Sequence, residues 1–497
     1  MLTFIITKCI ISATRKRETM IKKSKTLNPY LLLIISFMAF VFIGSFLLSM
    51  PFVFRNNPNN EWCHVGTYMD AFFTSLSAMS LTGVTTYPDG LVNTLNGVGQ
   101  TIVLILVQIG GLGIVTILTF LFSTFRRKLQ FKDRLMVSQA IAFNNFSEIV
   151  RFVRRLMIIT AICETIGFGL GLPVFSQLFP NDIPRALAYS IFHSISSFNN
   201  AGFDLFNSTN SLIGGLFANT GQTIEATNWL YYYFNIYNGA LSLLGGISFL
   251  VIIDTVFENR NPRRWSSFTK IILVMTGGLV LVGSALLFLT DGLKADNPMS
   301  IFQVIMQIIN CRTAGYSVYP QSEISLPGRM ICAFMMFVGG SPLSTAGGIK
   351  VTTIFIIMTS IFSYFSGKRL APFKRTFSET IIAKSMTIVF LVVTIIMVAF
   401  VAIGFFGVTK VDGRSIDPKL EEDLYGMYLF SVFSFFGNVG FYTGLEPFFS
   451  IGAKIVLCFL MLLGHLGPMT FFQLFQNNLD KKASVHYSFV EEDFLIG

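Results

Sequence analysis

The chain has 497 residues, of which 53% are apolar and 12% are charged, whereas an average soluble domain has about 25% charged residues. Its 54 Phe residues and this apolar share exceed what a soluble core can hide, so much of the surface must face lipid. The composition excludes a water-soluble globular protein and predicts an all-α polytopic membrane protein. In a soluble chain the net charge of +10 would suggest a nucleic-acid partner, so the positions of the charges have to be considered.

The first 27 residues precede the first apolar span. An apolar run at 1–11 comes before three basic residues at 15–17, and a signal peptide has the opposite order. Residues 1–27 are therefore expected to form a cytoplasmic N-terminal tail.

Four short segments repeat along the chain. Each has an aromatic- or Ser-rich run that ends in small residues and one Gly. The segments are SLSAMSLTGVTT (75–86), SISSFNNAGFDL (194–205), MQIINCRTAGYSV (306–318) and SVFSFFGNVGFYT (431–443), with their glycines at Gly83, Gly202, Gly315 and Gly440. These glycines are 119, 113 and 125 residues apart, which indicates four related units.

One apolar span precedes each Gly segment and another follows it. The preceding spans are 29–53, 152–178, 268–290 and 385–407, and the following spans are 98–122, 230–256, 328–362 and 451–476. About 20 helical residues cross the hydrocarbon core of a membrane. A short polar segment between two spans is tolerated at that depth only when it lines water or is buried in protein.

We therefore expect four M1-P-M2 repeats, with eight transmembrane helices and four re-entrant pore loops around one central pore. The expected repeats are 28–125, 126–257, 258–366 and 367–477, and a cytoplasmic C-terminal tail follows at 478–497. A second motif supports this division, because each following span carries glycines in the same register. These stretches are IGGLGIVT (109–116), LGGISFLV (244–251), VGGSPLST (338–345) and LGHLGPMT (463–470). Small residues of this kind allow helices to approach closely.

Most basic residues fall on one side of the expected membrane. Of the 36 Lys and Arg, 26 lie in the N-terminal tail, in the segments 126–155, 258–270 and 367–384, and in the C-terminal tail. Short loops rich in Lys and Arg stay in the cytoplasm. Both termini are thus expected inside, in a multi-pass protein of the plasma membrane. The charge is spread along the membrane, so attraction to lipid explains it better than nucleic acid does.

The four Gly segments have the chemistry of a cation filter. A re-entrant helix directs its negative carboxyl end toward the pore centre, and rings of backbone carbonyls replace the hydration shell of a potassium ion. Glycine reaches the backbone angles that such carbonyls require. The candidate filter residues are Leu81, Thr82, Gly83, Asn200, Ala201, Gly202, Thr313, Ala314, Gly315, Asn438, Val439 and Gly440.

The second span of the third repeat contains several helix-breaking residues. Pro removes a backbone donor and Gly lowers helix stability, so the middle of this span is predicted to be unwound. The residues concerned are Gly339, Gly340, Ser341, Pro342, Ser344, Thr345, Gly347 and Gly348. The alternative is a kinked helix with a packing role.

These motifs resemble the superfamily of potassium transporters that includes the Trk, Ktr and plant HKT proteins. The resemblance extends from about 28 to 476 and includes GGSPLSTAGGIKV (339–351). Only one span precedes Gly83, so the chain is most similar to the Ktr-type membrane subunit. The resemblance implies potassium uptake, a homodimer and an intramembrane gate at 339–349. In HKT relatives a Ser at the first filter position accompanies sodium transport, and here Gly83 favours potassium as the transported ion over sodium.

Three residues near the expected pore carry positive or titratable groups. Members of the family usually have Arg where this chain has His465, and imidazole is only partly charged at neutral pH. His465 is therefore either a weaker or pH-sensitive barrier or an ordinary buried His. Lys350 is either an anchor that reaches the membrane surface or a second positive element near the pore. Arg312 is expected to support the third filter segment from behind.

Acidic residues are sparse within the spans. Glu164 is about midway along its span and is the candidate to test for proton coupling. On the outer side, Asp70, Asp89, Asp204 and Glu446 either concentrate cations at the pore mouth or are ordinary loop charges.

The sequence lacks the motifs of a nucleotide-binding domain or an intramembrane enzyme. There is no GxGxxG, Walker A, HExxH or nucleophile elbow. The resemblance implies that a separate cytoplasmic RCK-type subunit regulates transport, and membrane lipid is the other expected partner. The alternatives within transport are sodium- or proton-coupled symport and, with less support from four repeats, a carrier for a non-ion substrate.

Overall fold

The structure is a computed structural model. It describes residues 29–55, 57, 61–63, 65–113, 146–206, 229–258, 261–295, 297–368, 371–409, 423–469 and 471. The expected N-terminal tail (1–27) and C-terminal tail (478–497) lie outside the described residues, as does most of the basic segment 126–155.

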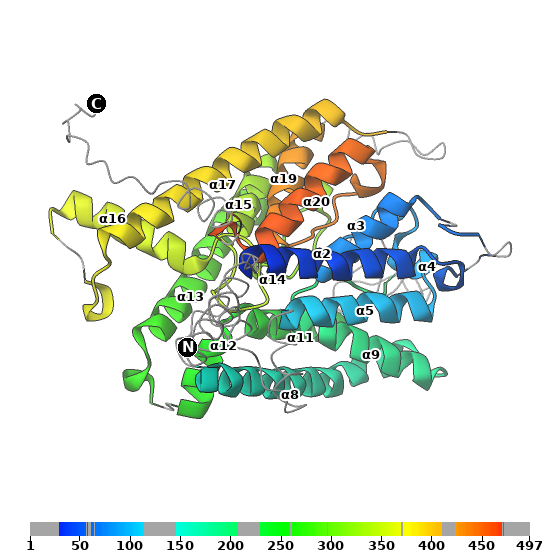
Figure 1. The fold of residues 1–497 in the computed structure, drawn as a ribbon, viewed down its shortest axis with the longest axis horizontal. Coiled ribbons are helices and arrows are strands. Elements are labelled where there is room, and N and C mark those ends of the chain that lie inside the picture. Colours follow the sequence, from blue (N-terminus) through cyan, green and yellow to red (C-terminus); the bar gives the residue numbers. More distant parts are fainter. Residues whose placement is uncertain are drawn as a thin grey trace, which may run out of the picture.

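The described residues are helical and contain no β-strand, which confirms the all-α prediction (Figure 1). The long first helices of the four repeats are α2 (Pro29–Leu48), α8 (Phe146–Leu178), α13 (Ser267–Leu287) and α17 (Glu379–Phe406). The re-entrant pore helices are α3 (Tyr68–Met79), α9 (Ile183–Phe198), α14 (Ile301–Cys311) and α19 (Leu424–Gly437). The second helices are α5 (Gly97–Leu112), α11 (Trp229–Gly246) with α12 (Phe249–Ile252), α15 (Leu326–Phe337) with α16 (Val351–Ser366), and α20 (Ile451–Leu466).

Short helices connect these elements. They are α4 (Gly90–Thr94), η1 (Pro51–Val53), η2 (Ile253–Glu258), η3 (Pro262–Arg264), η4 (Phe288–Gly292), η5 (Gln321–Glu323), η6 (Pro372–Lys374) and η7 (Glu446–Phe448). The order first helix, pore helix, second helix therefore occurs four times in the described chain, which is consistent with the expected repeats.

Helix length distinguishes the first helices from the second. By length and composition, four helices of the described chain can span a membrane, and all four are first helices. A fifth qualifies if α11 and the following helix Phe249–Glu258, which are bent by 95° to each other, count as one span. Leu281, Phe390 and Phe405 on the first helices are each more than 70% exposed, as side chains that face lipid are.

All four second helices end at the aligned glycine motif, which corrects the sequence prediction. An interruption was expected only in the third repeat, yet α5 and α20 also end there, followed by Gly113 (φ 74°) and Gly467 (φ 83°). Helices of 16 residues such as these are about 24 Å long, which is shorter than the hydrocarbon core. Glycine at positive φ accounts for the helix ends.

Close packing on the pore helices explains why these positions are small. A Cβ on Gly110, Gly245 or Gly464 would overlap a backbone carbonyl oxygen near the end of the pore helix of the same repeat. Those oxygens belong to Met79, Phe198 and Phe436, respectively. The second helices can therefore lie directly against the carboxyl ends of the pore helices.

The repeats contact one another in a closed ring. The second helix of each repeat packs against the pore helix of the next, in the pairs α5 with α9, α11 with α14, and α15 with α19. The ring closes between the last and first repeats, because α20 packs against α3. The pore helices are thus enclosed by the other helices.

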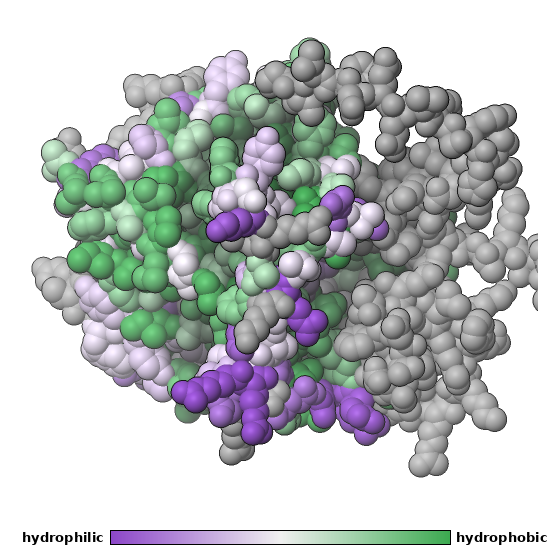
Figure 2. Space-filling model, turned by 90° about the vertical axis from the view of Figure 1, so that its left-hand side faces the viewer, coloured by the Kyte–Doolittle hydropathy of each residue, from purple (hydrophilic) through white to green (hydrophobic). Residues whose placement is uncertain are grey.

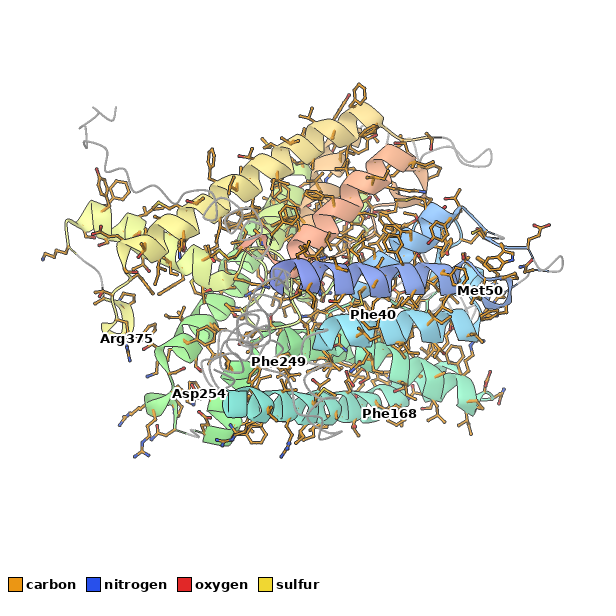
Figure 3. All side chains as sticks on the ribbon, viewed as in Figure 1. Phe40, Met50, Phe168, Phe249, Asp254 and Arg375 are labelled. Carbon is orange, nitrogen blue, oxygen red and sulfur yellow. The ribbon has the colours of Figure 1, made fainter. Side chains whose placement is uncertain are left out.

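The loops that precede the first helices of the third and fourth repeats lie at one end of the molecule. Met50, at one end of the long helices, lies opposite Asp254 and Arg375 at the other end (Figure 3). The end that carries Asp254 and Arg375 has hydrophilic side chains gathered over its lower part (Figure 2), and Arg263 and Arg264 next to this region are exposed. The loops assigned to opposite sides of the membrane therefore lie at opposite ends.

We predict that Gly110→Ala destabilises the protein whereas Gly169→Ala does not. Both glycines lie inside helices, but only Gly110 contacts a carbonyl, and a Cβ on Gly169 meets nothing within 4 Å. Overpacking at Gly110 should cost about 1–3 kcal/mol, whereas Ala at position 169 should be neutral or stabilising. Thermal unfolding in detergent measures both, and equal unfolding temperatures for the two variants would contradict the proposed close packing.

Candidate ion filter and intramembrane loop

Four filter segments, residues 81–83, 200–202, 313–315 and 438–440, share one unusual backbone conformation. In each, the residue two positions before the glycine has a positive φ, and so does the glycine, while the residue between them does not. The first group consists of Leu81 (62°), Asn200 (56°), Thr313 (79°) and Asn438 (51°). Positive φ is uncommon for residues other than Gly, so its occurrence at four equivalent positions shows that these segments have the same local structure.

The glycines hold the four segments against one another. A Cβ on any of the four would lie less than 3.0 Å from a carbonyl oxygen of the neighbouring repeat. The pairs are Gly83 with Ala201, Gly202 with Ala314, Gly315 with Val439, and Gly440 with Thr82. These four contacts join each repeat to the next and the fourth repeat to the first. The predicted filter residues are therefore brought together in one ring, and any residue larger than Gly would overlap it.

A polar side chain from each pore helix holds the filter segment from outside. The partner is always the backbone of the residue after the glycine. Val84 N donates to Ser77 Oγ (2.9 Å), Ser196 Oγ to Phe203 O (2.7 Å), Asn310 Nδ2 to Tyr316 O (2.7 Å), and Phe441 N to Ser434 Oγ (3.0 Å). Sequence reasoning did not single out these four residues, although their Ser-rich runs were visible.

The third repeat uses a different residue for this contact. Ser77, Ser196 and Ser434 stand six positions before their glycines, whereas Asn310 stands five positions before Gly315. The Asn310 side chain is longer than that of Ser, and it reaches the carbonyl of Tyr316, the residue after Gly315, although Asn310 is one position nearer to the glycine. An alignment on Ser alone would therefore miss the fourth member of the set.

Residues 338–350 form a non-helical intramembrane loop between α15 and α16. This loop contains all eight residues predicted to interrupt the third span. Ser341 N donates to Gly246 O (3.3 Å), and Phe249 N donates to Leu343 O (3.1 Å), so the loop is tied to the bend between α11 and α12. Its backbone groups thus find partners within the protein, which non-helical chain at membrane depth requires.

The intramembrane loop also contacts two of the filter segments and the residue before a third. Thr345 Oγ1 lies 3.3 Å from the side-chain amide of Asn200, and a Cβ on Gly347 would overlap Asn438 Oδ1. Arg312, directly before the third segment, donates from Nη2 to Gly339 O (3.2 Å) and from Nη1 to Thr276 O (3.3 Å). These bonds agree with the expected role of Arg312 as a support from behind.

The two candidate positive groups lie near each other beside the loop. Lys350 Nζ donates to Ala346 O (2.6 Å), so its side chain turns toward the loop rather than reaching for the membrane surface. His465 occupies the position that is Gly in the aligned motifs of the other three repeats. Its ring lies 5.2 Å from that of Phe37 and contacts the backbone of Ser80. Lys350 is close enough to act on it electrostatically.

The acids that were expected on the outer side differ in their surroundings. Asp70 is paired with Lys454 of α20 (2.6 Å), and both side chains are at most 10% exposed. Glu446 is fully buried and accepts bonds from Thr443 N (2.9 Å) and Gly444 N (2.9 Å). These two residues stabilise the structure. Asp204, two positions after Gly202, is the one that stands directly beside a filter segment.

Comparison with known proteins identifies the family. The family model TrkH, described as a cation transport protein, matches residues 1–277 and 293–487. The chain belongs to the TrkH family of cation transport proteins. It is therefore a membrane cation transporter and not an enzyme.

Relatives from three bacteria agree with this assignment. The chain is 30% identical to the potassium/sodium uptake protein NtpJ of Enterococcus hirae over 96% of this chain and all of that protein. It is 29% identical to the Ktr system potassium uptake protein B of Bacillus subtilis, over 92% of this chain and 95% of that protein. The crystal structure of the potassium transporter TrkH from Vibrio parahaemolyticus has the same fold, with a TM-score of 0.64, 17% identity, and coverage of 91% of this chain and 86% of that one.

We predict that Lys454→Met strongly destabilises the protein. The substitution leaves the buried Asp70 carboxylate without its cation, and breaking a buried pair from one side costs about 3–5 kcal/mol. Adding Asp70→Asn should recover much of this loss, since no unpaired charge is then buried. Thermal unfolding in detergent provides the measurement, with exposed Lys384→Met as the control. Equal destabilisation by Lys454→Met and by the control would show that the pair contributes little.

Proposed function

We propose that the chain takes up potassium ions across the plasma membrane through the four filter segments. The observation that carries the proposal is the closed ring in which each filter glycine contacts a carbonyl of the next repeat. Backbone carbonyls arranged around one axis can replace the water around a potassium ion. The names of the relatives from Bacillus subtilis and Enterococcus hirae, which both include potassium uptake, support this choice of ion.

The intramembrane loop is proposed to act as the gate. Residues 338–350 contact the filter segments through Thr345 and Gly347, and the loop is joined to helices at both ends. Because its backbone is held by single hydrogen bonds rather than by a helical ladder, it can change position at lower cost than the helices around it.

Assembly and topology are proposed on the same basis. Two chains form a dimer, both termini face the cytoplasm, and a separate cytoplasmic RCK-type subunit regulates the gate. The exposed basic residues at one end of the molecule, including Arg263 and Arg264, support a cytoplasmic position for that end. The proposed repeats keep the boundaries 28–125, 126–257, 258–366 and 367–477.

Sodium is the alternative ion, either transported itself or coupled to potassium. The name of the relative from Enterococcus hirae includes sodium as well as potassium. A chain with glycine at all four filter positions is nevertheless expected to prefer potassium, and proton coupling is a further form of symport to be separated by experiment.

We predict that the intact chain, supplied with its regulatory subunit, restores growth of a potassium-uptake-deficient cell at low potassium, and that Gly315→Ser does not. A Cβ on Gly315 would overlap Val439 O, and the φ of 71° is strained for Ser. Uptake of a potassium tracer should fall at least tenfold, or about 1.4 kcal/mol in barrier height.

The matched control is Gly277→Ser on α13, where a Cβ meets nothing within 4 Å. Growth should be measured with and without sodium, which separates potassium uptake from sodium-coupled uptake. Failure of the intact chain to restore growth under either condition would contradict the potassium assignment.

We predict that His465→Arg slows potassium uptake or alters its pH dependence. A guanidinium is charged at all relevant pH values, whereas an imidazole is not, so the variant carries a permanent positive charge beside Lys350. Tracer uptake between about pH 5.5 and 8, the range in which His titrates, tests this effect. If potassium uptake by the variant equals that of the parent over this whole pH range, His465 is excluded as a barrier to the ion.

A further inference from the structure

Glu164 has an acidic side chain inside an apolar span. The proposed function gives this side chain no role. It lies in α8, within the window Val150–Leu178 that is apolar enough to cross a membrane. Among the described residues the ion pairs are Arg155–Glu258, Arg329–Asp423 and Lys454–Asp70, so no Lys or Arg of the described chain pairs with Glu164. Carboxyl groups are costly at this depth, and where they occur they have a partner and a function.

Two side chains hydrogen-bond the carboxyl group of Glu164, Gln108 of α5 and Asn199, the residue that leads into the second filter segment. Asn199 Nδ2 donates to Glu164 Oε1 (3.1 Å). Asn199 is the first residue after the end of α9, and Asn200, with its positive φ, follows it directly. The carboxyl group therefore acts on the junction between the pore helix and the filter.

Asn199 is held from three sides and is almost completely buried, with 1% of its surface exposed. Besides Glu164 of α8, its amide donates to Gln108 Oε1 of α5 (3.1 Å) and to Ile195 O of its own helix (2.9 Å). A Cβ on Gly111 would overlap Asn199 Oδ1. The side chain has no room to turn, so its position is set by the groups that accept its hydrogen bonds.

The next repeat anchors the same position in a related way. Arg312 stands three residues before Gly315, as Asn199 stands three residues before Gly202. Arg312 reaches Thr276 O on the first helix of its repeat, and Asn199 reaches Glu164 on the first helix of its own. Two filter segments are thus each fixed to a first helix at the same point.

The contact continues to the intramembrane loop. Asn200 is the next residue in the chain after Asn199, and the side-chain amide of Asn200 lies 3.3 Å from Thr345 Oγ1. A displacement of Asn199 therefore moves both a filter residue and a contact of the loop.

We propose that Glu164 is a positioning residue that determines ion selectivity by holding Asn199, and through it the second filter segment. This inference rests on the proposed function, because selectivity is a property of the filter. Glu164 does not touch the transported ion, and it acts as a hydrogen-bond acceptor at a fixed place behind the filter.

The test is the ratio of potassium to sodium uptake in vesicles that contain the intact chain with its regulatory subunit. A ratio measured on one preparation does not depend on how much protein has folded. Glu164→Ala should lower the ratio by about tenfold, the factor that corresponds to loss of one hydrogen bond of ordinary strength. Glu164→Gln keeps an acceptor oxygen for Asn199 and should retain most of the parental ratio.

Two further variants make the test specific. Asn199→Ala removes the bond to Glu164 together with those to Gln108 and Ile195, so it should lower the ratio at least as much as Glu164→Ala does. The double variant should be no worse than Asn199→Ala alone, because the contact with Glu164 is already lost there. If Glu164→Ala does not fold, Glu164→Met, which fills the space of the side chain but has no acceptor oxygen for Asn199, takes its place in the comparison with Glu164→Gln. Thr165→Val is the matched control, since Thr165 is exposed and bonds only Ala161 O within the helix.

An unchanged ratio in Glu164→Ala, additive losses in the double variant, or a Gln variant as defective as the Ala variant would each overturn the inference. In these cases the parent still prefers potassium, so the proposed function stands. A parent that takes up no potassium overturns the proposed function and this inference together.

Discussion

The structure depends on how closely four backbone segments can approach one axis. At each filter glycine the Cα lies against a carbonyl oxygen of the next repeat, at a distance that leaves no space for a side chain. Under the proposed function the carbonyl dipoles of the four segments face one axis, where they repel one another in a medium of low polarity. A cation on the axis offsets this repulsion, so under the proposed function the ion stabilises the ring that selects it.

The segments themselves are short, and the surrounding helices hold them in place. Each pore helix supplies one polar side chain to the residue after the glycine, and in the first, second and fourth repeats the second helix ends at small residues that contact the pore helix. Because the four repeats belong to one chain, each can be supported differently. Asn310 replaces Ser in the third repeat, Glu164 supports the second, and Asn438 Nδ2 donates to Thr82 Oγ1 (3.0 Å) between the fourth and the first.

Some of these features were predictable from the sequence and others were not. The four glycines recur with regular flanks, and the Gly- and Pro-rich stretch at 339–348 is incompatible with a continuous helix, so the filter segments and the loop were identified. The helix ends at Gly113 and Gly467 were missed, because Gly in a membrane helix is usually explained by packing. The pairing of Asp70 with Lys454 joins distant parts of the chain and leaves no local pattern.

That pairing has a consequence for how the protein is made. Asp70 and Lys454 are 384 residues apart, and at a synthesis rate of about 5–20 residues per second the lysine follows the aspartate by roughly 20 to 80 s. Until the lysine is made, the partners of this carboxylate within its own repeat are the hydroxyls of Thr67 and Thr86 and one backbone N–H. The contact between α20 and α3 that closes the ring can therefore form only when the ribosome has nearly finished the chain.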